Sequence, residues 1–249
     1  VQYVLHEAAL GSIPRSINDP ITTNDVNIGG FLNMLVAARD SNIRRFIFAA
    51  SSSTYGDNTD LPKKEDNIGR PLSPYALTKY VDELYADVFA KTYGIEYIGL
   101  RYFNVFGRRQ DPNSMYAAVI PLFIKQFLNH KQPKINGDGL NTRDFTYIDN
   151  VLHMNMLALN TTNTQAVNQI YNTAGGGRTS INKLANEIKS CLVQYDFSIS
   201  DINPIYGAYR LGDIPHSFAS IDKAKQLLGY GQVAKRMILS TWPVGMQEM

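Results

Sequence analysis

The sequence lacks several features that mark specialised classes of protein. Cys191 is the only cysteine, so an internal disulfide is excluded and a reducing compartment is expected. No stretch approaches the ~18 consecutive apolar residues that a membrane span needs. The 24 basic and 22 acidic residues nearly cancel, so no nucleic-acid or membrane surface is indicated. We therefore expect a cytoplasmic protein without nucleic-acid or membrane partners and without a metal site.

The chain also has no initiator methionine. Its first residues, 1–6, already have the apolar pattern of a buried strand, and a domain rarely begins inside its core. We therefore expect a fragment in which the N-terminal strands of a larger sheet are missing.

Strand-like and helix-like segments alternate over the first 110 residues. Apolar runs at 45–50 and 96–102 have the length of buried strands, and apolar residues recur at helical spacing within 24–41 and 75–93. Together with the strand at 1–6, this alternation predicts an α/β fold with a doubly wound parallel sheet of the Rossmann type.

The pattern is less regular after residue 110. Helices are expected at 117–129, 149–160 and 181–194, the second with Asp149 as N-cap, and short strands at 133–136 and 169–174. We predict that residues 1–110 form a partial Rossmann domain. Residues 111–249 are expected to be mainly a smaller C-terminal α/β substrate-binding subdomain, with some segments returning to the main sheet. This subdomain should cover the carboxyl edge of the sheet, where ligands of such folds bind.

A serine run and a Tyr-x-x-x-Lys pair are the main indication of catalytic chemistry in the sequence. Ser51 begins a hydroxyl-rich turn directly after an apolar strand, and Tyr75 and Lys79 follow on a helix. The four-residue spacing puts both side chains on one helix face, where the lysine charge favours the phenolate and lowers a tyrosine pKa that is normally ~10. Each feature alone is common in structural turns and solvated helices, but together they favour a phenol acting as a base beside a nicotinamide.

These motifs resemble those of the extended short-chain dehydrogenases/reductases, in particular the NAD-dependent nucleotide-sugar epimerase/dehydratase family. Within it the chain is most similar to UDP-N-acetylglucosamine 4-epimerases. The segment Pro71-Leu72-Ser73-Pro74 matches the family's lead-in to the catalytic helix, and the similarity extends from residue 1 to about residue 230.

The resemblance implies roles at the cofactor. Tyr75 is the expected general base, Lys79 its electrostatic partner and a ligand of the nicotinamide ribose, and Ser51 the hydrogen-bond partner of the sugar C4 hydroxyl. Further contacts to NAD are expected from the strand-end motif and from two later positions: Ala8, Ala9, Asn27 and Val105.

The resemblance also implies a set of substrate contacts. Arg143 and Arg210 are expected at the diphosphate, because a guanidinium suits phosphate oxygens, and Asp213 at the ribose. The other implied contacts reach the sugar and its substituents: Gly11, Ser12, Ser52, Ser53, Asn104, Ala118 and Ser217. Gly11, Ser12, Ala118 and Ser217 resemble the small residues that line a pocket wide enough for an N-acetyl group.

Two reactions compete on this scaffold, and both begin by oxidising the sugar at C4 with NAD. Dehydratases of the family carry an adjacent Asp-Glu pair where this chain has Ser52 and Ser53. The resemblance therefore implies C4 epimerisation through a 4-keto intermediate. UDP-GlcNAc/UDP-GalNAc is the first choice of substrate, UDP-linked N-acetyl uronic acids the second, and UDP-glucose/UDP-galactose the third.

The sequence departs from the family pattern at the Gly-rich turn that binds the NAD pyrophosphate, which is absent. A non-catalytic chain that binds only the UDP end is therefore the alternative of a different class. Relatives pair the helices corresponding to 24–41 and 75–93 in a four-helix interface, so a homodimer is expected. Surface polysaccharide precursors are the usual products of such enzymes.

Overall fold

A parallel sheet forms the centre of the molecule. The computed structural model describes residues 1–111, 113, 118–209 and 214–233. The sheet has the order β1-β2-β3-β8, from strands β1 (Tyr3–His6), β2 (Arg45–Ser51), β3 (Glu96–Tyr102) and β8 (Gln169–Thr173). All three pairings are parallel, and the central pair runs in register from Arg45 opposite Glu96 to Ser51 opposite Tyr102. The parallel sheet expected from the sequence is confirmed.

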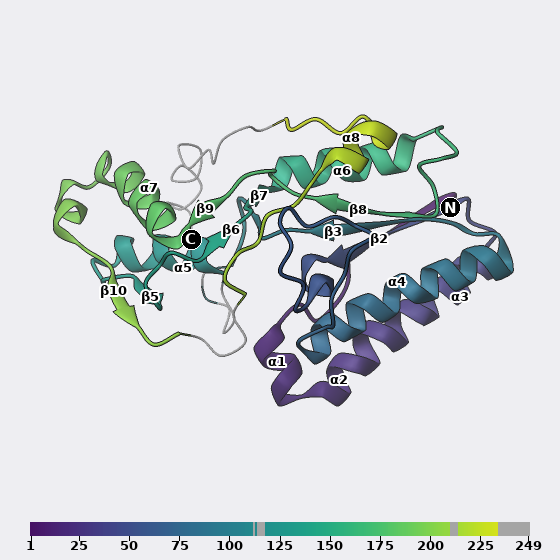
Figure 1. The fold of residues 1–249 in the computed structure, drawn as a ribbon, viewed down its shortest axis with the longest axis horizontal. Helices are drawn as coiled ribbons and strands as arrows, with labels where there is room; N and C mark the ends of the chain where they lie inside the picture. The colour runs from purple at the N-terminus through teal and green to yellow at the C-terminus, as the bar shows by residue number, and fades with distance from the viewer. Residues whose placement is uncertain (112, 114–117, 210–213, 234–249) are drawn as a thin grey trace.

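Helices cover both faces of this sheet, which confirms the doubly wound architecture (Figure 1). Helices α3 (Gly30–Asp40) and α4 (Pro74–Tyr93) pack on one face, and α6 (Ile148–Asn160) and α8 (Asp222–Leu228) on the other. Successive side chains of β2 point to opposite faces. Phe46 and Phe48 therefore join the hydrophobic cluster under α3 and α4, whereas Ile47 joins the cluster under α6.

Helix α4 has clear start and stop signals in the sequence. The Ser73 side chain accepts a hydrogen bond from the Ala76 N–H at 3.1 Å, and Pro74 occupies the first turn, where a missing N–H costs nothing. Gly94 ends the helix with φ 73°, a left-handed conformation that glycine adopts without strain. These signals fix the position of Tyr75 in the first turn of the helix.

The segment before α3 is more divided than its sequence pattern predicts. Helices α1 (Ile13–Asn18) and α2 (Pro20–Asn24) are followed by a π-helix, η1 (Asp25–Gly29), which runs into α3. The single helix expected over 24–41 is therefore a π-turn followed by an α-helix. Such π-turns inside helices are frequent at functional sites.

A smaller lobe lies beyond the carboxyl ends of the main strands, on the left in Figure 1. It contains α5 (Val119–Leu128), α7 (Ile181–Val193), a 3-10 turn η3 (Phe197–Asp201), and short strand pairs: β5 (Lys134–Asn136) with β10 (Ile205–Gly207), and β6 (Thr142–Arg143) with β9 (Thr179–Ser180). Buried residues including Phe123, Phe127 and Leu184 form its own hydrophobic cluster. Helix α6 and strand β8 return to the main sheet. The domain division at residue 110 stays a prediction.

One local expectation is wrong. Helix α6 begins at Ile148 after Tyr147, and Asp149 lies inside its first turn instead of capping it. A carboxylate in the first turn is still favoured by the partial positive charge of the helix N-terminus.

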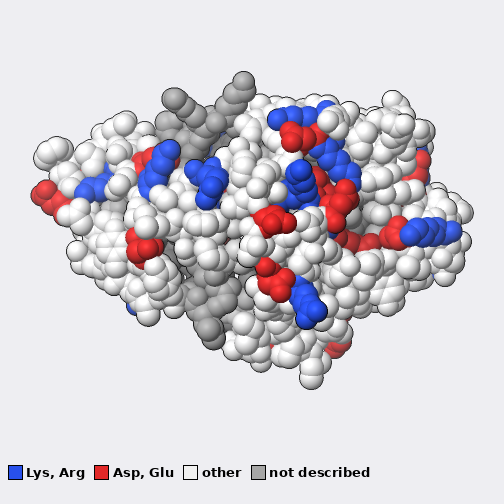
Figure 2. Space-filling model, in the orientation of Figure 1, with Lys and Arg blue, Asp and Glu red and all other residues white. Residues whose placement is uncertain are grey.

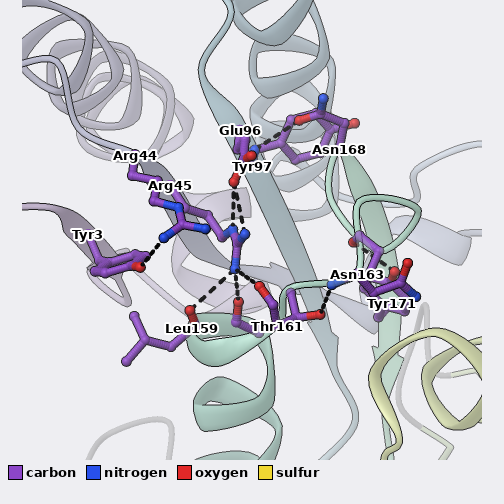
Figure 3. Close-up of polar contacts among 12 residues, drawn as sticks. Tyr3, Arg44, Arg45, Glu96, Tyr97, Leu159, Thr161, Asn163, Asn168 and Tyr171 are labelled. Carbon is purple, nitrogen blue, oxygen red and sulfur yellow. Dashed lines mark hydrogen bonds and ion pairs between the residues drawn. The ribbon is translucent and has the colours of Figure 1, made fainter.

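The C-terminal end of α6 is held by a buried arginine (Figure 3). The Arg45 guanidinium is paired with Glu96 at 2.9 Å and donates hydrogen bonds to the carbonyls of Ala158, Leu159 and Thr161 at 2.9–3.2 Å. The last carbonyls of a helix lack partners within the helix, and a cation there is electrostatically favoured. Arg45 thus joins β2, β3 and α6 at the amino edge of the sheet.

The charges on one face of the molecule are mixed in sign. Figure 2 shows Lys and Arg interspersed with Asp and Glu on one face, with uncharged residues covering most of it. Within the described ranges, no helix combines the length and apolarity that crossing a membrane requires. The same residues contain no cluster of three or more His, Cys, Asp or Glu suited to a metal ion.

Candidate functional site

The end of β2 supplies the first hydroxyl of the site. Ser51 is the last residue of β2 and precedes a 3-10 turn, η2 (Ser52–Tyr55). Its Oγ lies 2.7 Å from the Oγ of Ser53 and accepts a hydrogen bond from the Ser53 N–H at 3.2 Å. The sequence expectation of a hydroxyl cluster at the carboxyl edge of the sheet thus has a defined geometry: Ser51 and Ser53 share a hydrogen bond.

Helix α4 brings Tyr75 and Lys79 to the same edge. The Lys79 Nζ donates to the carbonyl oxygen of Ala49 on β2 at 2.9 Å and lies 3.4 Å from the Asp82 Oδ2. An ammonium group has three N–H donors. The third has no acceptor among the described residues, so it is available to a ligand at this edge.

The electrostatics of Tyr75 differ from the sequence expectation. Burial raises the pKa of Tyr75, the hydrogen bond with Ser51 lowers it, and the charge of Asp82 raises it. The interaction that lowers the pKa of Tyr75 is therefore the hydrogen bond with Ser51. The sequence predicts that the charge of Lys79 lowers this pKa, but Lys79 is paired with Asp82, and a paired charge acts more weakly on its neighbours.

Asn27 connects the loop after β1 to helix α4. It lies in the π-helix, is buried, accepts a hydrogen bond from the Leu10 N–H at 2.8 Å and donates to the Thr78 Oγ1 at 3.0 Å. The sequence predicts a cofactor contact here, and the structure places the side chain in contacts with the protein. Thr78, between Tyr75 and Lys79, was not identified from the sequence. Its i+3 spacing from Tyr75 was the available signal.

The loop after β1 leaves room for a ligand at the same edge. Ala8 is exposed and Ala9 partly exposed, and a side chain added at Gly11 would meet no atom within 4 Å. The Ser12 hydroxyl caps α1 by accepting from the Arg15 N–H at 3.2 Å. Small side chains here, together with the hydroxyls of Ser51 and Tyr75 and the free donor of Lys79, fit the nicotinamide and ribose half of NAD. The pyrophosphate-binding turn is absent from the sequence, so the fit concerns this half.

A second group of predicted residues lies where the two lobes meet. Asn104, with φ 35°, donates through Nδ2 to the carbonyl of Asp144 at 3.1 Å, and Val105 begins β4 (Val105–Phe106), which pairs with β7 (Thr146–Tyr147). Asp144 is fully buried, and burial raises its pKa to about 7. This junction therefore couples the end of β3 to the segment that carries Arg143.

Arg143 and Ser217 lie side by side in sequence-distant segments. The Arg143 guanidinium donates to the carbonyls of Thr142 at 3.0 Å and Pro215 at 3.3 Å, and the Ser217 N–H donates to the Thr142 carbonyl at 3.0 Å. Ala118 is exposed directly before α5. Arg210 and Asp213, the predicted late contacts to UDP, lie outside the described residues.

A pocket opens beside these groups. It lies between the loop after η2 and the segment before Ser217, and its lining includes Asn58, Lys63, Leu72 and His216. Ser51, Tyr75 and Lys79 do not line it. The pocket therefore does not enclose these three residues.

Buried ionic contacts fix α4 on the sheet. Arg101 of β3 forms a bidentate pair with Glu83 of α4, at 2.8 and 2.7 Å, and its guanidinium lies 4.8 Å from the ring centre of Tyr55. The Tyr55 hydroxyl donates to the Asn172 Oδ1 at 2.6 Å. Sequence reasoning missed this network, although Glu83 follows Lys79 at i+4 on the same face. It holds the helix that carries Tyr75 and Lys79.

The fold and this edge define a class of protein: a Rossmann-type α/β enzyme with a serine, a tyrosine and a lysine assembled at the carboxyl ends of parallel strands. A family model described as the NAD dependent epimerase/dehydratase family matches residues 1–174. The chain belongs to this family.

Relatives with known names agree on the reaction and differ in the sugar. A putative UDP-glucose 4-epimerase of Methanocaldococcus jannaschii is 38% identical over 91% of this chain and 71% of its own length. The solved UDP-N-acetylglucosamine 4-epimerase from Methanobrevibacter ruminantium M1, in complex with UDP-N-acetylmuramic acid, has a TM-score of 0.88 and 40% identity, covering 96% of this chain and 73% of that one.

A third similar protein was solved with the cofactor NAD bound. The UDP-glucuronic acid 4-epimerase from Bacillus cereus, solved with UDP-glucuronic acid and NAD, has a TM-score of 0.86 and 30% identity, covering all of this chain and 76% of that one. The enzyme class of this chain is therefore nucleotide-sugar 4-epimerase, with NAD as the cofactor of the class and a nucleotide sugar as substrate.

Proposed function

We propose that this protein interconverts UDP-GlcNAc and UDP-GalNAc by epimerisation at C4, with Tyr75 as the general base. The observation that carries the proposal is the assembly of Ser51, Tyr75 and Lys79 at one edge of the sheet. Ser52 and Ser53 occupy the η2 turn beside them. Because neither can act as the carboxylic acid or carboxylate of a dehydratase, the arrangement favours epimerisation over loss of the C6 hydroxyl.

The residues of this chain would handle the proton of the C4 hydroxyl. Ser51 orients that hydroxyl through a hydrogen bond, and the phenolate oxygen of Tyr75 removes the proton and later returns it. Against the rise that burial causes, the hydrogen bond with Ser51 lowers the pKa of Tyr75, and the third donor of the Lys79 ammonium would hold the nicotinamide ribose. NAD supplies the hydride acceptor and donor for C4. Ala8, Ala9 and Val105 would bound the cofactor, and Asn27 would hold the loop after β1 in place for it.

The substrate choice depends on the space around the sugar. Gly11, Ser12, Ala118 and Ser217 are small, which supports a pocket wide enough for an N-acetyl group. Asn104 would contact the diphosphate-sugar part, Arg143 and Arg210 the diphosphate, and Asp213 the ribose. The similarity to an epimerase crystallised with UDP-N-acetylmuramic acid favours an N-acetylated sugar. UDP-linked N-acetyl uronic acids are the second candidate and UDP-glucose/UDP-galactose the third.

The base assignment is tested with Tyr75→Phe. Removing the phenol oxygen should lower kcat by at least ~100-fold, because proton transfer by a positioned group contributes 10²–10⁴-fold. Binding of UDP-GlcNAc, followed by calorimetry, should stay within a few-fold of wild type. Tyr93→Phe, at the exposed far end of α4, is the matched control and should keep wild-type turnover. Wild-type turnover in Tyr75→Phe would refute the assignment.

We also propose a homodimer in which α3 and α4 of two copies form a four-helix bundle. Leu77, Leu84 and Val88 lie on α4 with exposed fractions of 51%, 48% and 51%, and Met34 on α3 is 38% exposed. Apolar residues at spacings of seven and four form one helix face. Packing against a second copy would remove this apolar face from water. We also still expect the protein to be located in the cytoplasm.

A further inference from the structure

Asp82 is a buried carboxylate to which the proposed reaction gives no role. It lies on α4, one turn after Lys79, and is almost completely buried. Its Oδ2 lies 3.4 Å from the Lys79 Nζ, and its Oδ1 is buried without a hydrogen-bond partner in the described part of the chain. Burying an ionisable group with an unpartnered oxygen is unfavourable. A carboxylate at this position therefore calls for an explanation beyond packing.

The position of Lys79 gives that explanation. Its side chain is 4% exposed and that of Asp82 is 1% exposed, so their contact is shielded from water. On its other side the ammonium donates to the Ala49 carbonyl at 2.9 Å. Two acceptors, one from β2 and one from α4, thus fix a long side chain that otherwise has many rotamers.

We propose that Asp82 is a positioning residue for the epimerase reaction: its carboxylate holds the Lys79 ammonium against the Ala49 carbonyl and balances the charge that Lys79 presents to Tyr75. The inference rests on the proposed role of Lys79 beside the base. It assigns Asp82 no contact with substrate or cofactor.

Other charged groups around Asp82 are paired or distant. Glu83 is the second charged neighbour on α4, and it is bound by Arg101 of β3. On the β1 side, burial and the charge of Lys79 lower the pKa of His6, and burial raises the pKa of Glu7 while the charge of Lys79 opposes that rise. The remaining charged residues on or beside elements packed against α4 are exposed or have other partners: Arg15, Asp19, Asp25, Arg39, Asp40, Arg45 and Glu96. Lys79 is therefore the cation in contact with Asp82 among the described residues.

The electrostatic effects agree with this geometry. Burial raises the pKa of Asp82 to about 7, and the charge of Lys79 opposes that rise. Asp82 in turn raises the pKa of Tyr75. An Asn at position 82 keeps an acceptor oxygen for Lys79 and removes the negative charge, whereas an Ala removes both. Comparing the two variants therefore separates the effect of the negative charge at position 82 from the effect of holding the Lys79 side chain in place.

The experiment compares the pH dependence of 4-epimerisation by the NAD-loaded enzyme in wild type, Asp82→Asn and Asp82→Ala. Asp82→Asn should move the acid limb of kcat/KM to lower pH by roughly half a unit or more, because Tyr75 loses a nearby negative charge. Asp82→Ala should lower kcat about 10-fold or more, with KM for the UDP-sugar within about twofold. The matched control, Asp87→Asn, changes an exposed carboxylate on the same helix that pairs with Lys91 and should match wild type.

A second readout needs no turnover. NMR relaxation of the Lys79 ε-methylene, assigned by its loss in Lys79→Met, should report a rigid group in wild type and Asp87→Asn and a mobile group in Asp82→Ala. An unchanged pH profile in Asp82→Asn, or a Lys79 group equally rigid in Asp82→Ala, would overturn the proposal. If Asp82→Ala does not fold, the pH profile of Asp82→Asn decides. If wild type epimerises no UDP-sugar, the proposed function fails, while the relaxation data still decide the role of Asp82.

Discussion

At the scale of single residues, the buried carboxyl group of Asp144 makes the stability of this protein depend on pH. Burial raises the pKa of Asp144 to about 7, far above the 3.8 of an unperturbed group. Between about pH 4 and 7 the folded chain therefore keeps a proton on this group that the unfolded chain has released. This contribution to stability is present in full below about pH 4 and is lost as the pH rises through 7.

The consequence is measurable at Asp144. Between pH 8 and pH 6 a carboxyl of this kind adds about 1 kcal/mol to the free energy of unfolding. Urea unfolding should thus show a gain in stability on acidification that is smaller by about this amount in Asp144→Asn than in wild type. Asp87→Asn, at an exposed site, should show the wild-type gain. An identical gain in wild type and Asp144→Asn would mean that Asp144 is ionised in the folded protein throughout this range.

At the scale of elements, α4 has two faces with different tasks. The inner face carries Lys79, Asp82 and Glu83 and is fixed to β2 and β3 through Ala49 and Arg101. The outer face carries exposed apolar side chains, among them Leu84 and Val88. A dimer interface on the outer face would stiffen the helix that carries the base, because the same helix is then packed on both sides.

The proposed interface is tested by Leu84→Glu. Placing a charge in the middle of an apolar helix face should shift the protein from dimer to monomer, because an unpaired buried charge is unfavourable. Light scattering after size-exclusion chromatography gives the mass. Lys91→Glu, on the same helix but ion-paired at its exposed end, is the control and should leave the mass unchanged. A wild-type chain that is monomeric at all accessible concentrations would exclude the bundle.

At the scale of the whole molecule, the proposed site joins two lobes. The proposed nicotinamide side is assembled from β2, α4 and the loop after β1, and the proposed diphosphate contact Arg143 lies on β6. Cofactor retention and substrate binding can therefore be measured as two separate properties of this chain.

The nucleotide content of the purified chain tests both properties. Because the proposed epimerisation needs NAD, denaturation and chromatography should release NAD from the chain, and calorimetry should detect binding of UDP. Arg143→Met should weaken that UDP binding by about 10-fold, since the proposed guanidinium–phosphate contact would be lost. Stoichiometric NAD in the 249-residue chain would show that the nicotinamide side suffices to hold the cofactor. Loss of both ligands would show that the smaller lobe needs the cofactor to bind UDP.

Local patterns in the sequence determined the elements that carry the chemistry. The apolar runs located β2 and β3, the Ser73-Pro74 start and the Gly94 stop located α4, and the four-residue spacing placed Tyr75 and Lys79 on one face. These features depend on residues close together in the chain, so they can be recognised from the sequence without knowledge of the fold. The same reasoning missed the π-helix before α3 and the cap of α6, where local propensity is weak.

Only the tertiary structure decided which groups lie next to these residues. Asn27 is tied to Thr78 across 51 positions, Arg45 caps a helix more than 110 positions away, and Asp82 is buried against Lys79 beneath a β2 carbonyl. Burial and long-range contact set the pKa of a carboxyl and the partners of an amide, and neither is encoded at a fixed spacing. The sequence by itself therefore determined which residues could react, and the packing of helices on the sheet decided which charges and contacts control them.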